Sequence, residues 1–254
     1  MLVVSIVSKK GGVGKSTLAM LLASGALKKE EKVCLIDADV NRQIGEWKSI
    51  FEETDWGNVE KPAWPDKLRL HADLEDLDAI FETLEKAQGE DVDLAIIDTR
   101  PGSYEDTAQL ALVSDVVLIP AEPEEASWRL VYGSFEWLVE LEGRIEKGAA
   151  FPNVRAVVSN TPTKMLDAAT REGGLSNLPA ADKDVLAKIL DTPTLDTMIP
   201  QSKILSRLLR HGPLPSAAEA YRNSRSGGLM VGNFEEMLAV AESLYDEVRE
   251  IGYA

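Results

Sequence analysis

A glycine-rich segment near the start of the chain has the residue types that bind phosphate. It reads Lys9-Lys10-Gly11-Gly12-Val13-Gly14-Lys15-Ser16-Thr17, between an apolar run and a helical pattern rich in alanine and leucine. Glycines let successive backbone N–H groups turn towards one anion, and the start of a helix adds partial positive charge. In such a loop Lys15 reaches the β- and γ-phosphates of a nucleotide, and the Ser16 hydroxyl binds Mg²⁺. We therefore predict that residues 10–17 bind a nucleoside triphosphate together with magnesium.

Carboxylates follow two of the later apolar runs. Asp37 and Asp39 come directly after residues 32–36, and Asp98 lies in the run Ile-Ile-Asp-Thr-Arg-Pro-Gly at residues 96–102, which closes a later strand. Residues two apart on a continuing strand point the same way, so we expect Asp37 and Asp39 near the metal and the γ-phosphate. Asp98 is expected to hold Mg²⁺ through water, with the following turn as a sensor of the γ-phosphate. The predicted metal ligands are therefore Ser16, Asp37 and Asp98.

The glycine loop and the three aspartates can form one site only if strands and helices bring them close together in space. Short apolar runs, which we expect to be strands, occur at residues 2–7, 32–36, 68–72, 94–97, 116–119, 154–159 and 197–200. They alternate with helical patterns at residues 16–29, 74–88, 124–146, 183–190, 204–210 and 233–250. This alternation predicts an α/β fold with a mostly parallel twisted sheet and helices on both faces. Ligands bind at the carboxyl edge of such sheets, where the glycine loop and the aspartates fall.

The organisation of the chain predicts one domain over residues 1–254. No segment rich in proline, glycine or serine divides it, and the least regular stretch is residues 52–67. That stretch contains Trp56 and Trp64, and we expect a surface loop held down by these two tryptophans. A local concentration of basic residues follows later, at residues 201–230.

Composition narrows the classes of function. The chain has 44% hydrophobic and 28% charged residues, which is typical of a globular protein and excludes disordered and fibrous classes. The apolar start is too short and lacks the basic residues of a secretion signal, so we expect a cytoplasmic protein. Cys34 is the only cysteine, which excludes a disulfide or a cysteine-paired metal centre within one chain. The net charge of −16 argues against a general nucleic-acid coat but leaves room for a local basic patch.

The glycine loop departs from the usual phosphate-loop pattern in an informative way. That pattern would place glycine at position 9, whereas this chain has Lys9 followed by Lys10. The segment from Lys10 to Ser16 resembles the deviant phosphate loop of the ParA/MinD family of P-loop ATPases. The resemblance implies ATP and Mg²⁺ as cofactors and a homodimer that encloses ATP. Lys10 would then reach the partner's nucleotide, where a second ammonium stabilises charge on the γ-phosphoryl group. The alternative for Lys10 is a solvated loop lysine.

The same resemblance assigns further residues. It implies that Asp39 positions the attacking water, so the catalytic residues would be Lys10, Lys15 and Asp39. It also implies that Asn160 and the Ile199-Pro200 turn flank the adenine base, since an amide can pair with the adenine edge. Plain turn chemistry is the alternative for both. Arg100 departs from the family's usual Asp-Thr-Pro-Pro, and it either contacts phosphate or a partner or simply solvates a turn.

The rest of the sequence separates branches of the family. Members that bind membranes end in a basic amphipathic helix, whereas residues 234–250 have six acids and one arginine, so we expect no membrane partner. The lone cysteine excludes the nitrogenase-type reductases. Residues 201–230 have five basic side chains and one acidic side chain, which favours binding to the phosphate backbone of DNA. The predicted DNA-binding residues are Lys203, Arg207, Arg210, Arg222 and Arg225, of which the first three would share one helix face. The alternative is that these residues pair with acidic helices of the same fold.

The segment ending at Trp47 and the region of Arg222 to Arg225 also resemble the VirC-type relatives of ParA in conjugal and T-DNA transfer. We therefore expect an ATPase that dimerises on ATP, binds DNA non-specifically and thus associates with the nucleoid, and leaves it on hydrolysis. Hydrolysis would be slow unless a ParB-like protein or a transfer-system adaptor stimulates it. Partition of a plasmid, positioning of a protein cargo and a transfer complex all remain open as the task. A metabolic synthetase on this fold would need a second small-molecule pocket, which no sequence constellation indicates.

Overall fold

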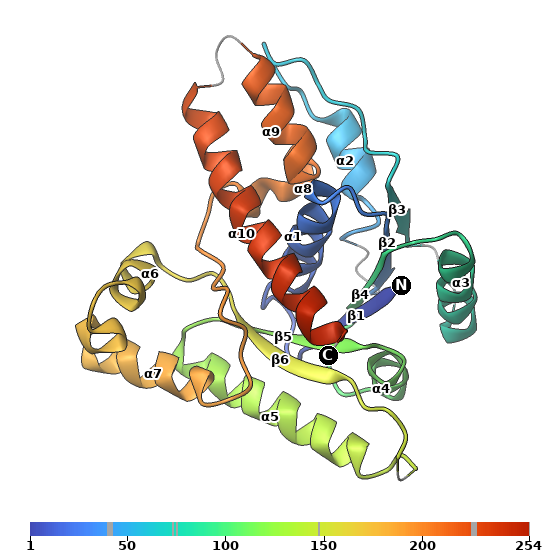
Figure 1. Cartoon of the computed structure of the whole chain (residues 1–254), viewed down its shortest axis with the longest axis vertical. Helices are drawn as coiled ribbons and strands as arrows, with labels where there is room; N and C mark the ends of the chain where they lie inside the picture. Colours follow the sequence, from blue (N-terminus) through green and yellow to red (C-terminus); the bar gives the residue numbers. More distant parts are fainter. Residues whose placement is uncertain (40–42, 73, 75, 147, 225–227, 254) are drawn as a thin grey trace.

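A six-stranded parallel sheet forms the centre of the protein (Figure 1). The computed structural model describes residues 1–39, 43–72, 74, 76–146, 148–224 and 228–253. The strands lie in the order β3-β2-β4-β1-β5-β6 and every pairing is parallel. Their bounds are β1 (Leu2–Ile6), β2 (Val33–Ala38), β3 (Leu68–His71), β4 (Leu94–Thr99), β5 (Val116–Ala121) and β6 (Asn153–Val158). This order confirms the α/β fold with a parallel sheet that the sequence predicts.

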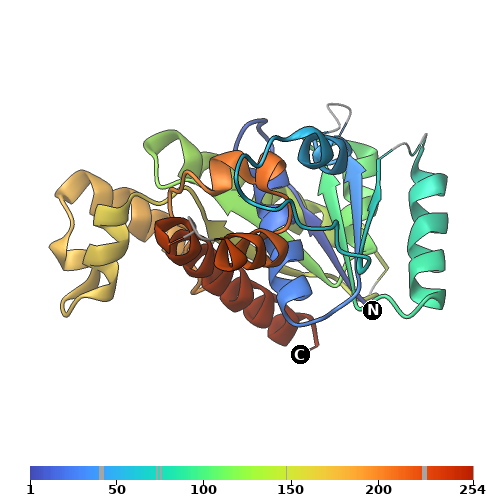
Figure 2. The same ribbon diagram turned by 90° about the horizontal axis from the view of Figure 1, so that it is seen from above.

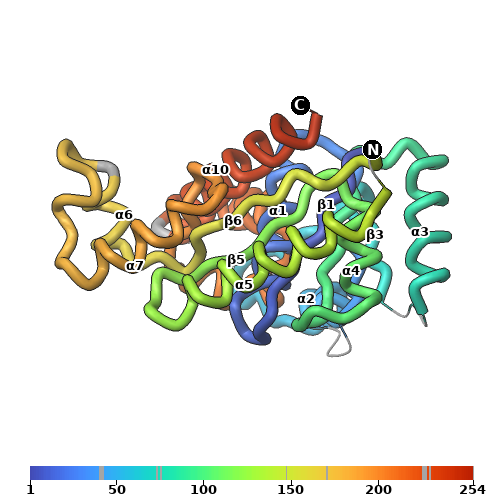
Figure 3. Tube along the Cα trace, turned by 90° about the horizontal axis from the view of Figure 1, so that it is seen from below, coloured from blue at the N-terminus to red at the C-terminus, as the bar shows by residue number. Residues whose placement is uncertain are grey.

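Helices cover both faces of the sheet. They are α1 (Lys15–Lys28), α2 (Trp47–Glu53), α3 (Leu77–Gly89), α4 (Glu105–Leu112), α5 (Glu125–Glu142), α6 (Thr163–Thr170), α7 (Ala180–Leu190), α8 (Leu208–His211), α9 (Leu214–Asn223) and α10 (Gly228–Gly252). Short 3₁₀ turns η1 (Gly174–Asn177) and η2 (Leu205–Arg207) complete the set. Figure 2 and Figure 3 show α3 at one end of the sheet and α6 with α7 at the other. Within the described ranges, no helix is both long and apolar enough to span a membrane.

The alternation of side chains along each strand divides the core into two sides. Val4 and Ile6 of β1 pack with α1, α9 and α10, whereas Val117 and Ile119 of β5 pack on the other side with α5 and α7. Both sides are apolar because the central strands are buried on both faces. Helix α1 is buried around most of its circumference, and Gly25 lets α10 approach it closely. A Cβ at Gly25 would lie 2.1 Å from the carbonyl oxygen of Ala241.

Two expected elements are wrong in detail. Residues 197–200 form no strand, and only an isolated bridge joins Thr161 to Pro200. Proline has no N–H to continue a ladder, which accounts for the single bridge. Residues 204–210 are not one helix, because η2 ends at Arg207, whose φ of −120° and ψ of 15° interrupt the helical geometry, and α8 begins only at Leu208. Lys203 precedes both pieces, so the shared helix face expected for Lys203, Arg207 and Arg210 is not formed.

The irregular stretch at residues 52–67 starts in the last turn of α2 and runs to β3. Its two tryptophans join an aromatic cluster. Trp64 lies 5.3 Å from the Trp47 ring and Trp56 lies 5.8 Å from the Phe51 ring, both edge to face. Trp56 also contacts Tyr221 of α9 at 5.7 Å. This cluster attaches the stretch and α2 to α8 and α9, and Figure 1 shows these elements together.

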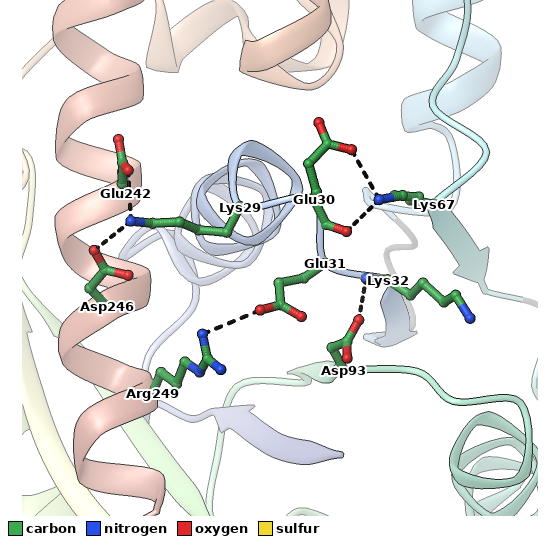
Figure 4. Close-up of polar contacts among 9 residues, drawn as sticks. All are labelled: Lys29, Glu30, Glu31, Lys32, Lys67, Asp93, Glu242, Asp246 and Arg249. Atoms are coloured by element: carbon green, nitrogen blue, oxygen red, sulfur yellow. Dashed lines mark hydrogen bonds and ion pairs between the residues drawn. The ribbon is translucent and has the colours of Figure 1, made fainter.

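A network of charged residues connects the end of α1 to its neighbours at the amino edge of the sheet (Figure 4). Lys29 contacts Glu242 at 2.7 Å and Asp246 at 3.0 Å, both on α10. Arg249 contacts Glu31 at 3.3 Å, so α10 is held to the turn after α1 as well. The remaining contacts are Lys67 with Glu30 at 3.0 Å and the Lys32 N–H with Asp93 at 2.8 Å.

Candidate nucleotide-binding site

The glycine loop joins the carboxyl end of β1 to the start of α1. Gly12 and Gly14 have φ values of 79° and 87°, which only glycine adopts without strain. The first turn of α1 has no acidic residue and no side-chain cap, so its N–H groups and partial positive charge face the loop unopposed. Lys15 is buried at the start of α1, whereas Lys10 is exposed. The loop therefore has the geometry of an anion-binding site, with one buried and one exposed ammonium group.

Ser16 and Asp98 meet below this loop. The Ser16 hydroxyl donates a hydrogen bond of 2.5 Å to Asp98 Oδ2, while Asp98 Oδ1 is buried without a partner among the described residues. Burial raises the pKa of the Asp98 carboxyl to about 7, against the lowering effects of the Ser16 hydrogen bond and of Lys15. A half-buried hydroxyl and an orphaned carboxylate oxygen are the hard oxygen donors that Mg²⁺ prefers. The residues present therefore fit a magnesium ion at this point.

Asp37 lies beside Asp98 but makes different contacts. The two residues are paired in register across β2 and β4. Asp37 Oδ1 accepts the Asp39 N–H at 3.1 Å, and Oδ2 accepts the N–H groups of Ile44 and Gly45, each at 2.9 Å. Burial raises the pKa of Asp37, and these backbone hydrogen bonds lower it. Asp37 thus organises the chain that leads to α2, while the side chain of Asp39 is half-buried at the same edge.

A cavity of about 170 Å³ opens beside the loop. Gly12, Gly14 and Thr17 line one side, and Asn160, Ile199 and Pro200 line another. Asn160 has a φ of 52°, and its amide donates a 3.0 Å hydrogen bond to Glu122. The structure therefore brings the two expected adenine-flanking segments to the phosphate loop. An apolar turn opposite an amide suits a flat heterocycle.

Glu122 is a residue of this cavity that the sequence interpretation missed. It directly follows β5, whose residues are all buried, so it stands at the carboxyl edge like Asp37 and Asn160. The position of Glu122 directly after a fully apolar run could have identified it from the sequence as a candidate site residue. Its partner could not be found in this way, because Asn160 lies 38 positions away and reaches it only through the pairing of β5 and β6.

Arg100 folds back onto its own turn. It donates a 2.5 Å hydrogen bond to Asp106, and its guanidinium lies 3.9 Å from the centre of the Tyr104 ring. Its Nε is buried and has no partner in the described part of the chain. The Gly102 N–H donates to the Ser8 carbonyl at 2.8 Å, which ties this turn to the phosphate loop. A second cavity of about 320 Å³ lies between Asp39, Arg100 and Thr107, where the sequence gave no sign of one.

Comparison with known proteins identifies the family. The family model described as VirC1 protein matches residues 1–251. This chain belongs to the VirC1 family. Protein virC1 of Rhizobium radiobacter is 26% identical over 134 residues, covering 53% of this chain and 54% of that protein. The match thus spans about half the length of this curated relative.

Solved structures of MinD and ParA have the fold of this VirC1-family chain. The match to the MinC:MinD cell division protein complex of Aquifex aeolicus has a TM-score of 0.64 at 19% identity and covers 97% of this chain and 96% of that one. The structure of pNOB8 ParA bound to nonspecific DNA gives 0.58 at 15% identity and covers 98% and 99%. At these identities the likeness establishes the fold. The resemblance to the ParA/MinD family, and to its VirC-type members, is confirmed.

The basic residues predicted to bind DNA in this VirC1-family chain differ in whether they form an ion pair within the protein. Lys203, Arg207 and Arg210 are exposed, and none of them forms an ion pair with another described residue. Arg222 instead pairs with Glu235 of α10 at 2.8 Å, as the alternative of internal pairing predicts. Arg225 lies outside the described residues. The structure therefore leaves three cations available for an external anion.

Proposed function

We propose that this VirC1-family chain is an ATPase of the ParA/MinD type that binds DNA in its ATP-bound form and releases it on hydrolysis. One observation carries the link between the two activities. Ser202, Leu205 and Ser206 line the nucleotide cavity, and the neighbouring Lys203 and Arg207 point their charges to solvent from the same short segment. A nucleotide that fills the cavity therefore contacts the segment that presents the cations.

The proposed chemistry follows from the residues at the carboxyl edge. Lys15 and the N–H groups of residues 11–17 bind the phosphates, and Ser16 with Asp98 holds Mg²⁺, which would neutralise charge on the phosphate oxygens. Asp39 orients the water for attack on the γ-phosphoryl group. Asn160 and Pro200 hold the adenine base. Lys10 is exposed at the loop, and in an ATP-bound homodimer it would serve the nucleotide of the second copy.

The DNA-binding part of the proposal rests on charge. Three exposed cations without an ion-pair partner among the described residues provide a local attraction for a polyanion in a chain of net charge −16. The fold is shared with pNOB8 ParA, a protein whose structure is described as bound to nonspecific DNA. A ParB-like protein or a transfer-system adaptor would stimulate hydrolysis and so release the dimer. The ATP-bound dimer would then occupy the nucleoid.

Fluorescence anisotropy of a labelled random-sequence duplex tests this function. The protein is Asp39→Ala, which should bind ATP without hydrolysing it, in Mg²⁺ with either ATP or ADP. Tight binding that weakens steeply with salt, and only with ATP, is the expected result. Size-exclusion chromatography of the same samples reports whether ATP produces the dimer.

Two results would contradict the proposal. Absence of DNA binding in both nucleotide states would remove DNA as a partner. Equal binding with ATP and ADP would show that the surface is basic but not controlled by the nucleotide. The Lys15→Ala protein is the control, because it should not form the ATP-bound state at ATP concentrations that saturate the unmodified protein.

A further inference from the structure

Trp47 connects the nucleotide site to the basic segment through buried contacts. It is the first residue of α2 and is fully buried, and its indole N–H donates a 2.9 Å hydrogen bond to the carbonyl oxygen of Leu208. Leu208 begins α8, one residue after Arg207 and two before Arg210. The same carbonyl accepts the Gly212 N–H at 3.0 Å, so Trp47 holds the turn that carries both arginines.

The other end of this connection is Asp37. Its Oδ2 accepts the N–H groups of Ile44 and Gly45, and the Trp47 N–H donates to the Ile44 carbonyl at 2.9 Å. Ile44 is fully buried, so this short chain segment is held on both sides by groups away from water. Trp47 lies three positions after Ile44, so a continuous set of hydrogen bonds leads from the Asp37 carboxylate through Ile44 to Trp47.

Close packing connects α2 to the residue that follows α8. Gly212 follows α8 with a φ of 70°, and a Cβ there would lie 2.5 Å from the Phe51 ring of α2. Phe51 also packs against Trp64 at 5.5 Å and Trp56 at 5.8 Å. Densely packed interfaces of this kind shift as units and do not deform continuously.

We propose that Trp47 is a positioning residue that transmits the nucleotide state at Asp37 to the basic segment around Arg207 and Arg210. The inference rests on the proposed function for its biological meaning. Its physical basis is the register pairing of Asp37 with Asp98, which places the Asp37 carboxylate next to the residues that fit Mg²⁺. A change of charge there acts on Asp37 first, and Asp37 holds the segment leading to Trp47.

The substitution Trp47→Phe tests the connection by removing the N–H donor while keeping an aromatic ring. Trp64→Phe is the matched control, because the Trp64 indole N–H also donates to a backbone carbonyl, that of Leu68 at 3.3 Å, within the same aromatic cluster. Both variants lose one indole hydrogen bond, but only Trp47 reaches α8. We measure DNA affinity with AMPPNP and with ADP, and AMPPNP affinity alone, for the three proteins.

Trp47→Phe should reduce the ratio of DNA affinities between AMPPNP and ADP by about fivefold, which corresponds to one lost hydrogen bond. Its affinity for AMPPNP should stay within about twofold of that of the parent protein, since no contact to the nucleotide cavity is altered. Trp64→Phe should keep the ratio of the parent. An unchanged ratio in Trp47→Phe, or an equal loss in both variants, would overturn the role of the Trp47 hydrogen bond.

Hydrogen–deuterium exchange at residues 208–212 separates this inference from the proposed function, because it requires no DNA. In the unmodified protein, AMPPNP with Mg²⁺ should change the exchange of these amides relative to ADP, and Trp47→Phe should abolish that change. If the exchange responds as expected but DNA does not bind, the proposed function fails and the connection stands. If the exchange of the unmodified protein is the same in both nucleotides, the connection itself is refuted.

Discussion

The two edges of the sheet carry similar charged residues in opposite arrangements. At the amino edge, each carboxylate drawn in Figure 4 contacts a cation or a backbone N–H. At the carboxyl edge, Asp98 is fully buried with one oxygen that has no partner among the described residues, and Lys10 of the phosphate loop is exposed. Charged groups that stabilise a fold have an ion pair or a hydrogen bond within the protein, whereas charged groups of a binding site acquire such a partner when the ligand binds. The comparison therefore separates residues kept for stability from residues kept for binding.

The largest expected effect compares one lysine from each edge. Lys15→Met should weaken ATP binding by at least about 100-fold, because the variant loses a buried ammonium that we propose contacts two phosphates, while the stem remains. Lys29→Met removes the same charge at the amino edge and should leave ATP affinity unchanged. Titration with a fluorescent ATP analogue in Mg²⁺ measures both. A similar loss in the two variants would abolish the distinction between the edges.

Asp98 should make the ligand-free protein less stable as the pH rises. Its pKa is raised to about 7 in the folded state from 3.8, so the folded protein holds a proton between about pH 4 and 7 that the unfolded chain has released. The free energy of unfolding therefore falls as the pH rises through this window and is level above it. Asp98→Asn should remove this slope and stabilise the ligand-free protein by up to about 4 kcal/mol at pH 8.

Urea unfolding at several pH values, without nucleotide or Mg²⁺, measures this effect. The matched control is Asp246→Asn at the amino edge, where the carboxylate contacts Lys29 and no gain in stability is expected. If Asp98→Asn instead lowers the free energy of unfolding at pH 8 by an amount typical of a core substitution, the Asp98 side chain stabilises the fold. Its charge then does not destabilise the carboxyl edge.

The basic segment offers the same contrast between paired and unpaired cations. Exchange of Arg207 and Arg210 together for glutamate should lower DNA affinity by at least about tenfold and make the salt slope shallower by about two. Arg222→Glu should have a smaller effect, because Arg222 already contacts Glu235. Anisotropy titrations over a range of salt concentrations measure both. Equal effects would show that the ion pair to Glu235 opens when DNA binds.

The smallest expected effect belongs to the amino edge. Lys29→Met should lower the melting temperature only slightly, since the ion pairs to Glu242 and Asp246 are partly exposed to water. In about 1 M salt the difference from the unmodified protein should disappear, because screening removes exposed pairs first. Differential scanning fluorimetry at two salt concentrations is sufficient. A difference that persists in high salt would mean that packing of the lysine stem, and not its charge, holds α10.

Local patterns in the sequence were sufficient for much of the fold and for the centre of the site. Continuous apolar runs located six strands, and the glycine loop and the aspartates followed from phosphate and metal chemistry. Helices α2, α4, α6 and α9 were missed, although Pro162 and Pro213 directly precede the last two, which is a usual start signal. The seventh strand was overestimated because Pro200 cannot continue a ladder, and the helix expected at residues 204–210 is divided at Arg207.

What the sequence alone determined is the set of groups that depend on local spacing: the phosphate loop, the strands that present Asp37, Asp39 and Asp98, and the excess of cations in residues 201–230. Only the tertiary structure determined which contacts each of these groups makes. Asp37 turned out to hold backbone N–H groups, Arg222 found Glu235, and Trp47 reached Leu208 across 161 positions. The physical reason is that a residue's type and spacing set which partners it can bind, whereas long-range packing decides which partner is near.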